Sequence, residues 1–286
     1  MSTAASGIAP RLRPLEAPVP GAAELAEARA TTQRVARTFA IACRLLPRAV
    51  RDDVYLLYMV FRTLDDLVDD SRPEAAAHVE AAAAWAAGRP GTRTREVAVL
   101  EALAVRHPLP RDAIADFCAG MRQDLAHETF DTEEELDRYC YRVAGTVGLV
   151  MTAILGARDP ERARPAAAAL GMAMQRTNIL RDIDEDAAAG RVYIARESAL
   201  RHGSLAPGRR ADLLRDQIAR ADALYEQGLA GIAELRQGRR AIAVAGAMYR
   251  EILREIERGG LGALPGRAVV SPGRKLVVAV QATRLA

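Results

Sequence analysis

The chain has 286 residues, half of them hydrophobic, and its 40 basic and 37 acidic side chains leave a net charge of +3. A chain of this length and hydrophobicity can bury a large core, and its nearly balanced charge gives no indication of a nucleic-acid or membrane-surface partner. Three cysteines without C-x-x-C spacing and four scattered histidines argue against a zinc centre and favour reduced core thiols in a cytoplasmic protein.

The first 23 residues contain four prolines among small side chains and lack the apolar segment that a secretory signal needs. We expect a disordered or loosely attached arm over residues 1–23 and a single helical domain over residues 24–286. The longest uncharged run, residues 143–157, is too short to span a bilayer. The sequence therefore predicts no transmembrane segment, and it leaves open peripheral membrane contact and the choice between monomer and homodimer.

Apolar residues recur at helical spacing along nearly the whole chain, and stretches with glycine and proline separate the periodic segments. No shift in composition marks a domain boundary. The pattern predicts an all-α protein with helices over residues 24–46, 50–70, 74–87, 95–105, 110–127, 132–157, 160–188, 207–237, 239–258 and 267–284.

The predicted helix over residues 50–70 is apolar on nearly every face and ends in four aspartates within residues 65–70. Asp65 and Asp69 are four residues apart, so on a helix they share a face and repel each other by about 0.2–0.5 kcal/mol. Mg2+ prefers carboxylate oxygens and would offset this repulsion. Arg62 and Tyr58 precede the aspartates and are candidates to contact a diphosphate. The alternatives are a solvated acidic surface, an ion pair between Arg62 and Asp66, and plain packing of Tyr58.

A second acidic stretch follows about 115 residues later, on the predicted helix over residues 160–188. Gln175, Asn178, Asp182 and Asp186 form one helical stripe where an amphipathic helix would ordinarily carry leucines. This mixture of amides and acids indicates the wall of a wet, metal-filled cavity better than it indicates an exposed face. Three further residues are candidates to bind phosphate or cap the site: Arg181, Arg191 and Tyr193.

With these motifs the chain resembles the phytoene/squalene synthase family, the head-to-head trans-prenyl diphosphate synthases, over roughly residues 33–280. The motifs are Arg62-Thr-Leu-Asp65-Asp66-Leu-Val-Asp69, Gly120-Met121-Arg-Gln-Asp124-Leu125, Tyr139-Cys-Tyr141-Arg-Val-Ala144-Gly145-Thr-Val147-Gly148, Gln175-Arg-Thr-Asn178-Ile-Leu-Arg181-Asp182-Ile-Asp-Glu-Asp186 and Gly190-Arg191-Val-Tyr193. The resemblance implies a class I terpenoid synthase, which is an all-α isoprenoid synthase bundle around a central cavity.

The resemblance also implies roles for individual residues. It implies two or three Mg2+ ions, or Mn2+ in their place, bound by Asp65, Asp69, Asn178, Asp182 and Asp186 with support from Asp66. It implies that the diphosphate is held by Arg62, Tyr58, Arg181 and Gln175. It implies a prenyl tunnel lined by Tyr139, Val143, Ala144, Val147, Gly148 and Leu155, with Thr38, Arg191, Tyr193 and Tyr249 as further substrate-binding residues.

In the family the expected reaction joins two prenyl diphosphates through a cyclopropylcarbinyl diphosphate, and the product is phytoene, dehydrosqualene, presqualene diphosphate or squalene. No NADPH-binding fingerprint is present, although this absence discriminates poorly. The alternatives are a prenyltransferase of specialised metabolism that donates one prenyl group to an aromatic acceptor, a terpene cyclase, and a non-enzymatic helical module with structural cations.

Two stretches depart from the family pattern. Residues 35–39 read Val-Ala-Arg-Thr-Phe, without the His-Ser or Tyr-Ala pair that many members carry before a Lys-Ser/Thr-Phe. Residues 259–262 read Gly-Gly-Leu-Gly, without the tyrosine that commonly follows the helix of Tyr249. Neither departure touches the acidic motifs, so the sequence predicts ionisation of a prenyl diphosphate. It leaves the acceptor and the prenyl chain length open, with Val35, Ala36 and Leu261 as the positions concerned.

Overall fold

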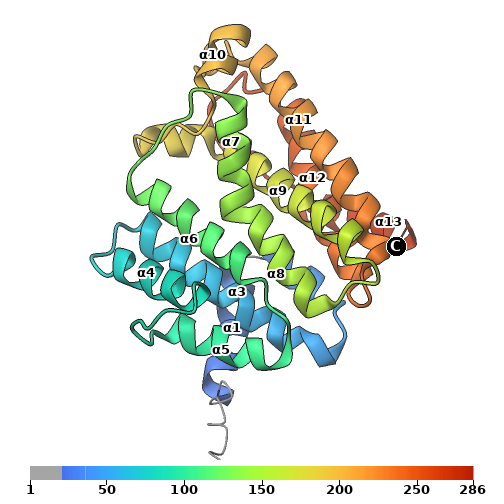
Figure 1. Cartoon of the computed structure of the whole chain (residues 1–286). Coiled ribbons are helices and arrows are strands. Elements are labelled where there is room, and N and C mark those ends of the chain that lie inside the picture. The colour runs from blue at the N-terminus through green and yellow to red at the C-terminus, as the bar shows by residue number, and fades with distance from the viewer. Residues whose placement is uncertain (1–20, 36, 286) are drawn as a thin grey trace, which may run out of the picture.

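The computed structural model describes residues 21–35 and 37–285, and within these ranges the regular elements are all helices (Figure 1). They are α1 (Ala22–Val35), α2 (Arg37–Cys43), α3 (Arg48–Asp69), α4 (Ala75–Ala86), α5 (Arg95–Arg106), α6 (Arg111–Leu125), α7 (Glu133–Cys140), η1 (Tyr141–Gly145), α8 (Thr146–Leu155), α9 (Pro160–Ala188), α10 (Arg196–His202), α11 (Ala211–Ala230), η2 (Gly231–Glu234), α12 (Arg239–Arg258) and α13 (Pro272–Leu285). The all-α prediction is confirmed.

The arm expected over residues 1–23 lies mostly outside the described residues, and its last two residues, Ala22 and Ala23, already belong to α1. The helix expected over residues 24–46 covers α1 and α2, and its predicted end is too late, because α2 ends at Cys43 and a turn follows. The last predicted helix starts too early, since α13 begins at Pro272, and proline suits the first position of a helix.

Two further predictions of helices are corrected. The helix expected over residues 207–237 is α11 followed by the short 3₁₀-helix η2. The helix α10 was not predicted, because its seven residues are too few to show a periodicity, and its one buried side chain is a serine. The helix expected over residues 132–157 contains a π-helical segment, η1, that separates α7 from α8. Such a segment inserts an extra residue per turn and is frequent at functional sites.

The helices α3 and α9 carry the two acidic motifs and have different reasons to form. Helix α3 is buried by its apolar residues, and Val54, Leu57 and Leu64 are at most 1% exposed. Helix α9 is long and begins with a strong cap, because the side chain of Asp159 accepts hydrogen bonds from two backbone N–H groups and Pro160 follows it. Both helices end with their acidic residues.

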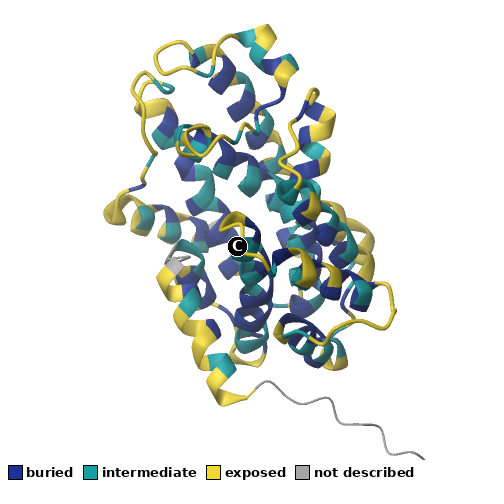
Figure 2. Cartoon of the chain, turned by 90° about the vertical axis from the view of Figure 1, so that its left-hand side faces the viewer, coloured by how far each residue is buried: buried dark blue, intermediate teal, exposed yellow. Residues whose placement is uncertain are grey.

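The apolar core has two main parts. One part joins α3 to α4, α5, α6 and α8, and the other joins α7, α9, α11 and α12. Figure 2 shows the buried positions on the inward sides of the helices and the exposed positions on their outer sides and in the loops. No helix in the described part of the chain is long and apolar enough to cross a membrane.

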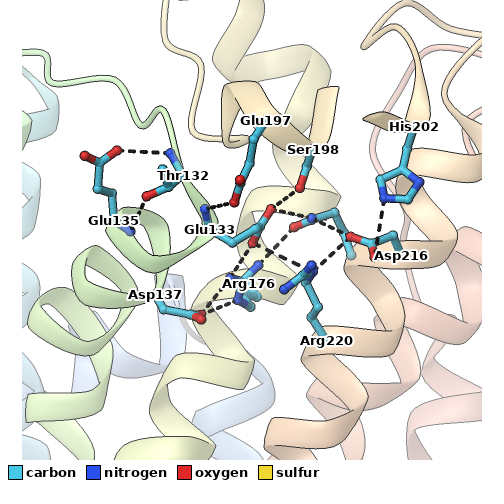
Figure 3. Close-up of polar contacts among 11 residues, drawn as sticks. Thr132, Glu133, Glu135, Asp137, Arg176, Glu197, Ser198, His202, Asp216 and Arg220 are labelled. Atoms are coloured by element: carbon cyan, nitrogen blue, oxygen red, sulfur yellow. Dashed lines mark hydrogen bonds and ion pairs between the residues drawn. The ribbon is translucent and has the colours of Figure 1, made fainter. Parts of the chain in front are cut away.

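A buried polar cluster joins α7, α9, α10 and α11 (Figure 3). The guanidinium of Arg176 is 2% exposed and donates hydrogen bonds to Glu133 at 2.7 Å, to Asp137 at 2.6 Å and to Gln217 at 2.9 Å. Glu133 also accepts hydrogen bonds from Gln217 at 2.7 Å and from Ser198. Burial alone would raise the pKa of Glu133, but the bonds from Ser198 and Arg176 hold it below its usual value. The cluster therefore fixes α9 against three other helices.

Candidate active site

A cavity of about 320 Å³ lies between α2, α3, η1, α8, α9 and α12. Its wall is apolar over most of its length and includes Leu57, Phe61, Phe117, Val147, Met151 and Leu170. Its polar residues include Tyr58, Arg62, Asp65, Gln175 and Asn178. Along α9 the wall runs from Ala163 to Asn178, and the amides of Gln175 and Asn178 mark its polar end. The cavity therefore has a polar end at the acidic motifs and a long apolar interior.

The first acidic motif is organised by Arg62, which lies one turn before it on α3. Its guanidinium is 3.1 Å from Asp65 and also pairs with Asp66, so the ion pair between Arg62 and Asp66 is confirmed. Burial raises the pKa of Asp65 to about 7, and the nearby Asp69 contributes to the rise. The carboxylates of Asp65 and Asp69 thus repel each other as their spacing predicts.

The two acidic motifs meet through Arg191, which follows α9. Its Nη1 lies 2.5 Å from Oδ1 of Asp69, and its Nη2 donates to the backbone oxygen of Asp69 at 3.2 Å. Burial raises the pKa of Asp186 to about 6, and Asp182 and Asp69 add to the rise. Carboxylates that are more than 110 residues apart in the sequence therefore influence one another across the site.

On α9 the second motif is held by a bidentate pair. Arg181 donates from Nε and Nη2 to the two oxygens of Asp182 at 2.8 and 2.5 Å, and Arg267 lies 3.0 Å from the same carboxylate. Asn178 donates to Gln175 at 3.3 Å. The side-chain oxygen of Asn178 is buried without a hydrogen-bond partner among the described residues. A buried acceptor without a donor is costly, and a cation would satisfy it.

The residues of the two motifs fit Mg2+ by their chemistry, since carboxylate and amide oxygens are its preferred ligands. The oxygen of Asn178 that lacks a hydrogen-bond partner also favours a bound cation, and so do the raised pKa values of Asp65 and Asp186. Among the described residues, no three carboxylate, histidine or cysteine side chains converge as a ready-made metal cluster. Arginines instead pair with Asp65, Asp69 and Asp182.

Asp124 is part of the site and was not given a role from the sequence. It lies at the end of α6, and the hydroxyl of Tyr139 donates to its two oxygens at 2.9 and 3.2 Å, with Tyr193 at 3.4 Å. Burial raises the pKa of Asp124 to about 6, and the carboxylate of Asp69 adds to the rise. From the sequence alone, nothing indicates which residues contact Asp124. The only sequence feature that pointed to it was the motif that runs from Gly120 to Leu125.

The predicted site residues divide into two sets. Those on the cavity wall are Tyr58, Arg62, Asp65, Gln175, Asn178, Tyr139, Val143, Ala144, Val147, Gly148, Leu155 and Tyr249. Those not on this wall are Thr38, Asp66, Asp69, Arg181, Asp182, Asp186, Arg191 and Tyr193. Asp186, Arg191 and Tyr193 line a smaller cavity of about 220 Å³. Thr38 lies on α2 beside Phe39, which does line the large cavity.

The small residues on η1 and α8 have a packing role. A Cβ atom on Gly148 would come within 2.3 Å of the backbone oxygen of Ala167, and one on Gly171 within 2.2 Å of that of Ala144. Close contact between α8 and α9 therefore explains Gly148, although it also borders the cavity. Of the departing positions, the side chains of Val35 and Ala36 lie outside the described residues, and Leu261 is not part of the cavity wall.

Comparison of the sequence with known proteins finds similarity to squalene and phytoene synthases. The family model described as squalene/phytoene synthase matches residues 32–274. A phytoene synthase of Thermus thermophilus is 39% identical over 245 residues, which is 81% of this chain and 82% of that protein. A phytoene synthase of Arthrospira platensis is 35% identical over 278 residues, which is 87% of this chain and 89% of that protein.

Solved structures show the same similarity in three dimensions. The crystal structure of a dehydrosqualene synthase in complex with ligand matches with a TM-score of 0.83 at 26% identity, over 92% of this chain and 96% of that one. The squalene synthase HpnC from Alicyclobacillus acidocaldarius matches with a TM-score of 0.73 at 26% identity, over 85% of this chain and 96% of that one.

Proposed function

Since the chain belongs to the squalene/phytoene synthase family of prenyltransferases and shares its isoprenoid synthase fold, we propose that it joins two prenyl diphosphates head to head with the help of Mg2+. We propose further that the product is of the phytoene type. The observation that carries the proposal is the long apolar cavity whose polar end holds Arg62 and Asp65 of the first motif and Gln175 and Asn178 of the second.

The length of the cavity supports a long prenyl chain. Its wall on α9 extends from Asn178 to Ala163, and 15 residues of helix rise about 22 Å. That distance is of the order of an extended chain of four isoprene units, and shorter chains would leave the end near Ala163 unfilled. A C20 prenyl diphosphate is therefore the proposed substrate.

In this proposal the residues of the polar end bind and orient the diphosphate. Asp65, Asp69, Asn178, Asp182 and Asp186 would hold Mg2+. Bound Mg2+ neutralises the negative charge of the leaving diphosphate. The guanidinium groups of Arg62, Arg181 and Arg191 would turn from the carboxylates that they contact now toward phosphate oxygens, which they bind in the same bidentate manner.

The apolar interior protects the carbocation that ionisation leaves. Its walls offer aromatic faces, including those of Phe61 and Phe117, whose ring centroids are 4.6 Å apart. Aromatic faces attract cations, and the walls exclude the water that would quench them. The wall offers no strong nucleophile, so the double bond of the second prenyl chain captures the cation. The second chain then loses a proton, which the released diphosphate can accept, and the ring closes to a cyclopropylcarbinyl diphosphate. After the second ionisation, the released diphosphate is the proposed final base.

Diphosphate release tests this proposal directly. The purified protein is incubated with C5, C10, C15 or C20 prenyl diphosphate in the presence of Mg2+ or of EDTA. We expect release from the C20 substrate with Mg2+ and none with EDTA. Asp65→Asn and Asp182→Asn should each lower turnover about 100-fold or more, since metal ligands supply several kcal/mol of charge stabilisation.

Asp70→Asn is the matched control, because Asp70 belongs to the same acidic run but caps the end of α3 and is exposed. It should leave turnover within about twofold of the wild type. Release that occurs only when an aromatic acceptor is added would favour transfer of a single prenyl group instead. If no prenyl diphosphate is consumed, alone or with acceptors, the enzyme assignment fails.

A further inference from the structure

The segment of residues 120–125 at the end of α6 holds a carboxylate, Asp124, that the proposed chemistry does not use. Asp124 is half-buried and is not part of the cavity wall. Its Oδ1 accepts hydrogen bonds from the hydroxyls of Tyr139 at 2.9 Å and Tyr193 at 3.4 Å, and its Oδ2 accepts one from Tyr139 at 3.2 Å. Both oxygens therefore serve tyrosine hydroxyls, and an effect of Asp124 on a substrate in the cavity passes through them.

Of these two tyrosines, Tyr139 is the one that lines the large cavity. Its ring packs against Phe130 and Tyr193, with ring centroids 5.0 and 5.4 Å away. Because the hydroxyl of Tyr139 donates to Asp124, its ring is the part that faces the cavity. An aromatic ring attracts a cation, and a hydrogen bond from the phenol to a carboxylate adds electron density to that ring.

Tyr139 lies at the polar end of the cavity. The wall follows residues 139–155 along η1 and α8, and it returns along residues 163–178 of α9. These two runs are antiparallel, since Gly148 lies against Ala167 and Gly171 lies against Ala144. The ring of Tyr139 therefore shares one end of the cavity with the amides of α9, where the diphosphate would leave and the allylic cation would form.

The π-helical segment η1 turns Tyr139 toward the cavity. The wall residues of α8 include Gly148, and regular helical spacing back from Gly148 would bring Tyr141 onto the same face. Instead, Tyr139 and Ala144 line the cavity and Tyr141 does not. Tyr139 and Ala144 are five residues apart, which is the spacing of one π-helical turn.

Gly120, at the start of the same segment of α6, lets this helix approach η1 closely. A Cβ atom on Gly120 would come within 2.7 Å of Cγ1 of Val143 and 3.0 Å of Cβ of Arg142. Asp124 follows four residues later, so it lies on the same face of α6. Gly120 thus makes room for the inserted turn, and Asp124 binds the hydroxyl of Tyr139, the tyrosine that this turn presents to the cavity.

We propose that Asp124 is a positioning residue that holds the ring of Tyr139 where the allylic cation forms. A role of Asp124 as metal ligand or proton acceptor fits less well, because both of its oxygens already accept hydrogen bonds from tyrosine hydroxyls and it lies outside the cavity wall. The inference rests on the proposed function, because only ionisation of a prenyl diphosphate gives the ring of Tyr139 a cation to stabilise.

Steady-state turnover of the C20 substrate with Mg2+ tests this role. Asp124→Ala should lower kcat about 100-fold, because a small misplacement of a group at the reacting centre costs about that much. It should change KM by less than about threefold, since the contacts of the diphosphate remain. Asp124→Asn keeps an oxygen that accepts from the hydroxyl of Tyr139, so its kcat should stay within about tenfold of the wild type. Equal losses in the two variants would overturn the inference in favour of a role for the charge.

A double-mutant cycle shows whether Asp124 acts through Tyr139. Tyr139→Phe removes the hydroxyl and should itself lower kcat. In the Tyr139→Phe background, Asp124→Ala should cost about fivefold or less, because the contact through which it acts is already gone. A full loss of about 100-fold in both backgrounds would overturn the inference, since Asp124 would then act by another route.

Asp116 and Tyr141 provide the matched control. The hydroxyl of Tyr141 donates to Asp116 at 3.4 Å, and this contact also joins α6 to η1. Neither residue lines the cavity. Asp116→Ala and Tyr141→Phe should therefore each leave kcat within about twofold of the wild type. Losses as large as those of Asp124→Ala and Tyr139→Phe would show that the contacts between α6 and η1 act through the fold alone, and this would overturn the inference.

The outcomes separate this inference from the proposed function. A wild type that releases no diphosphate from any prenyl diphosphate would overturn the proposed function, and the inference that rests on it would fall as well. A wild type that is active while Asp124→Ala matches it would overturn the inference alone. Circular dichroism reports whether each variant is folded. If Asp124→Ala does not fold, the comparison of Asp124→Asn with Tyr139→Phe decides, and a larger loss of kcat in Asp124→Asn would overturn the inference.

Discussion

Asp65 shows at the scale of one residue why the site needs a cation. Its side chain lies at the polar end of the cavity and is 41% exposed, and desolvation together with Asp69 raises its pKa to about 7 while Arg62 opposes them. An unperturbed aspartate has a pKa of about 3.9, so ionisation of Asp65 at neutral pH costs the folded state free energy. The pKa values of Asp186 and Asp124 are both raised to about 6, and burial is the main cause in each case.

These raised pKa values predict a pH dependence of stability in EDTA. Between about pH 4 and the raised values of about 6 to 7, the folded protein binds more protons than the unfolded chain, so stability falls as pH rises. Asp65→Asn removes one of these groups and should weaken the fall in Tm across that window. Thermal unfolding in EDTA at several pH values measures this dependence of Tm on pH. If Tm falls equally with pH in the wild type and the variant, the argument is contradicted.

Part of the site could be predicted from sequence at this scale and part could not. The spacing of Asp65 with Asp69 and of Gln175, Asn178, Asp182 and Asp186 is local, so a helical period reveals it. The contact of Arg191 with Asp69 joins residues 122 positions apart, and no local pattern encodes it. The bonds of two tyrosines to Asp124 are equally non-local.

At the scale of elements, the cluster around Arg176 positions α9 and with it the second acidic motif. Arg176→Ala would leave the buried Glu133 with only the more distant Arg220, 4.0 Å away, and breaking a buried ion pair costs about 3–5 kcal/mol. Urea unfolding should show this loss. Arg138→Ala breaks the exposed pair of Arg138 with Glu134 on α7 and should change stability by less than about 1 kcal/mol. Similar effects of the two substitutions would show that the cluster does not hold α9.

The residues of α9 at the apolar end of the cavity are expected to determine which prenyl chain length the protein accepts. Ala166 borders the cavity about three turns from Asn178 and is 7% exposed. Ala166→Leu should place a side chain in the path of the last isoprene unit and lower kcat/KM for the C20 substrate relative to C15 by about tenfold or more. Turnover of the C15 substrate reports that the variant is folded. An unchanged ratio would place the prenyl chain elsewhere.

The elements themselves were predictable where they are long, as α3 and α9 are, and where glycine or proline marks their ends. The short α10 was missed because polar contacts such as the bond between Ser198 and Glu133 hold it, and an apolar pattern does not. The π-helical η1 was also missed, since hydrophobic periodicity does not distinguish an inserted residue within a continuous helix.

At the scale of the whole molecule, charge is sorted between two regions. Acidic side chains gather where α3 and α9 end, whereas residues 28–51 and 259–286 contain ten basic residues and no acidic one. Among these ten, Arg29, Arg267 and Arg274 pair with acidic side chains of other segments. The net charge of +3 reveals neither region.

The ratio of diphosphate released to hydrocarbon formed tests the central claim most directly. The protein is given one C20 prenyl diphosphate with Mg2+ and no other acceptor, and both products are quantified. Head-to-head condensation predicts two diphosphates for each hydrocarbon and a product that contains two prenyl chains. One diphosphate for each product, with a single prenyl chain in it, would contradict the account and indicate a cyclase or a transfer to another acceptor.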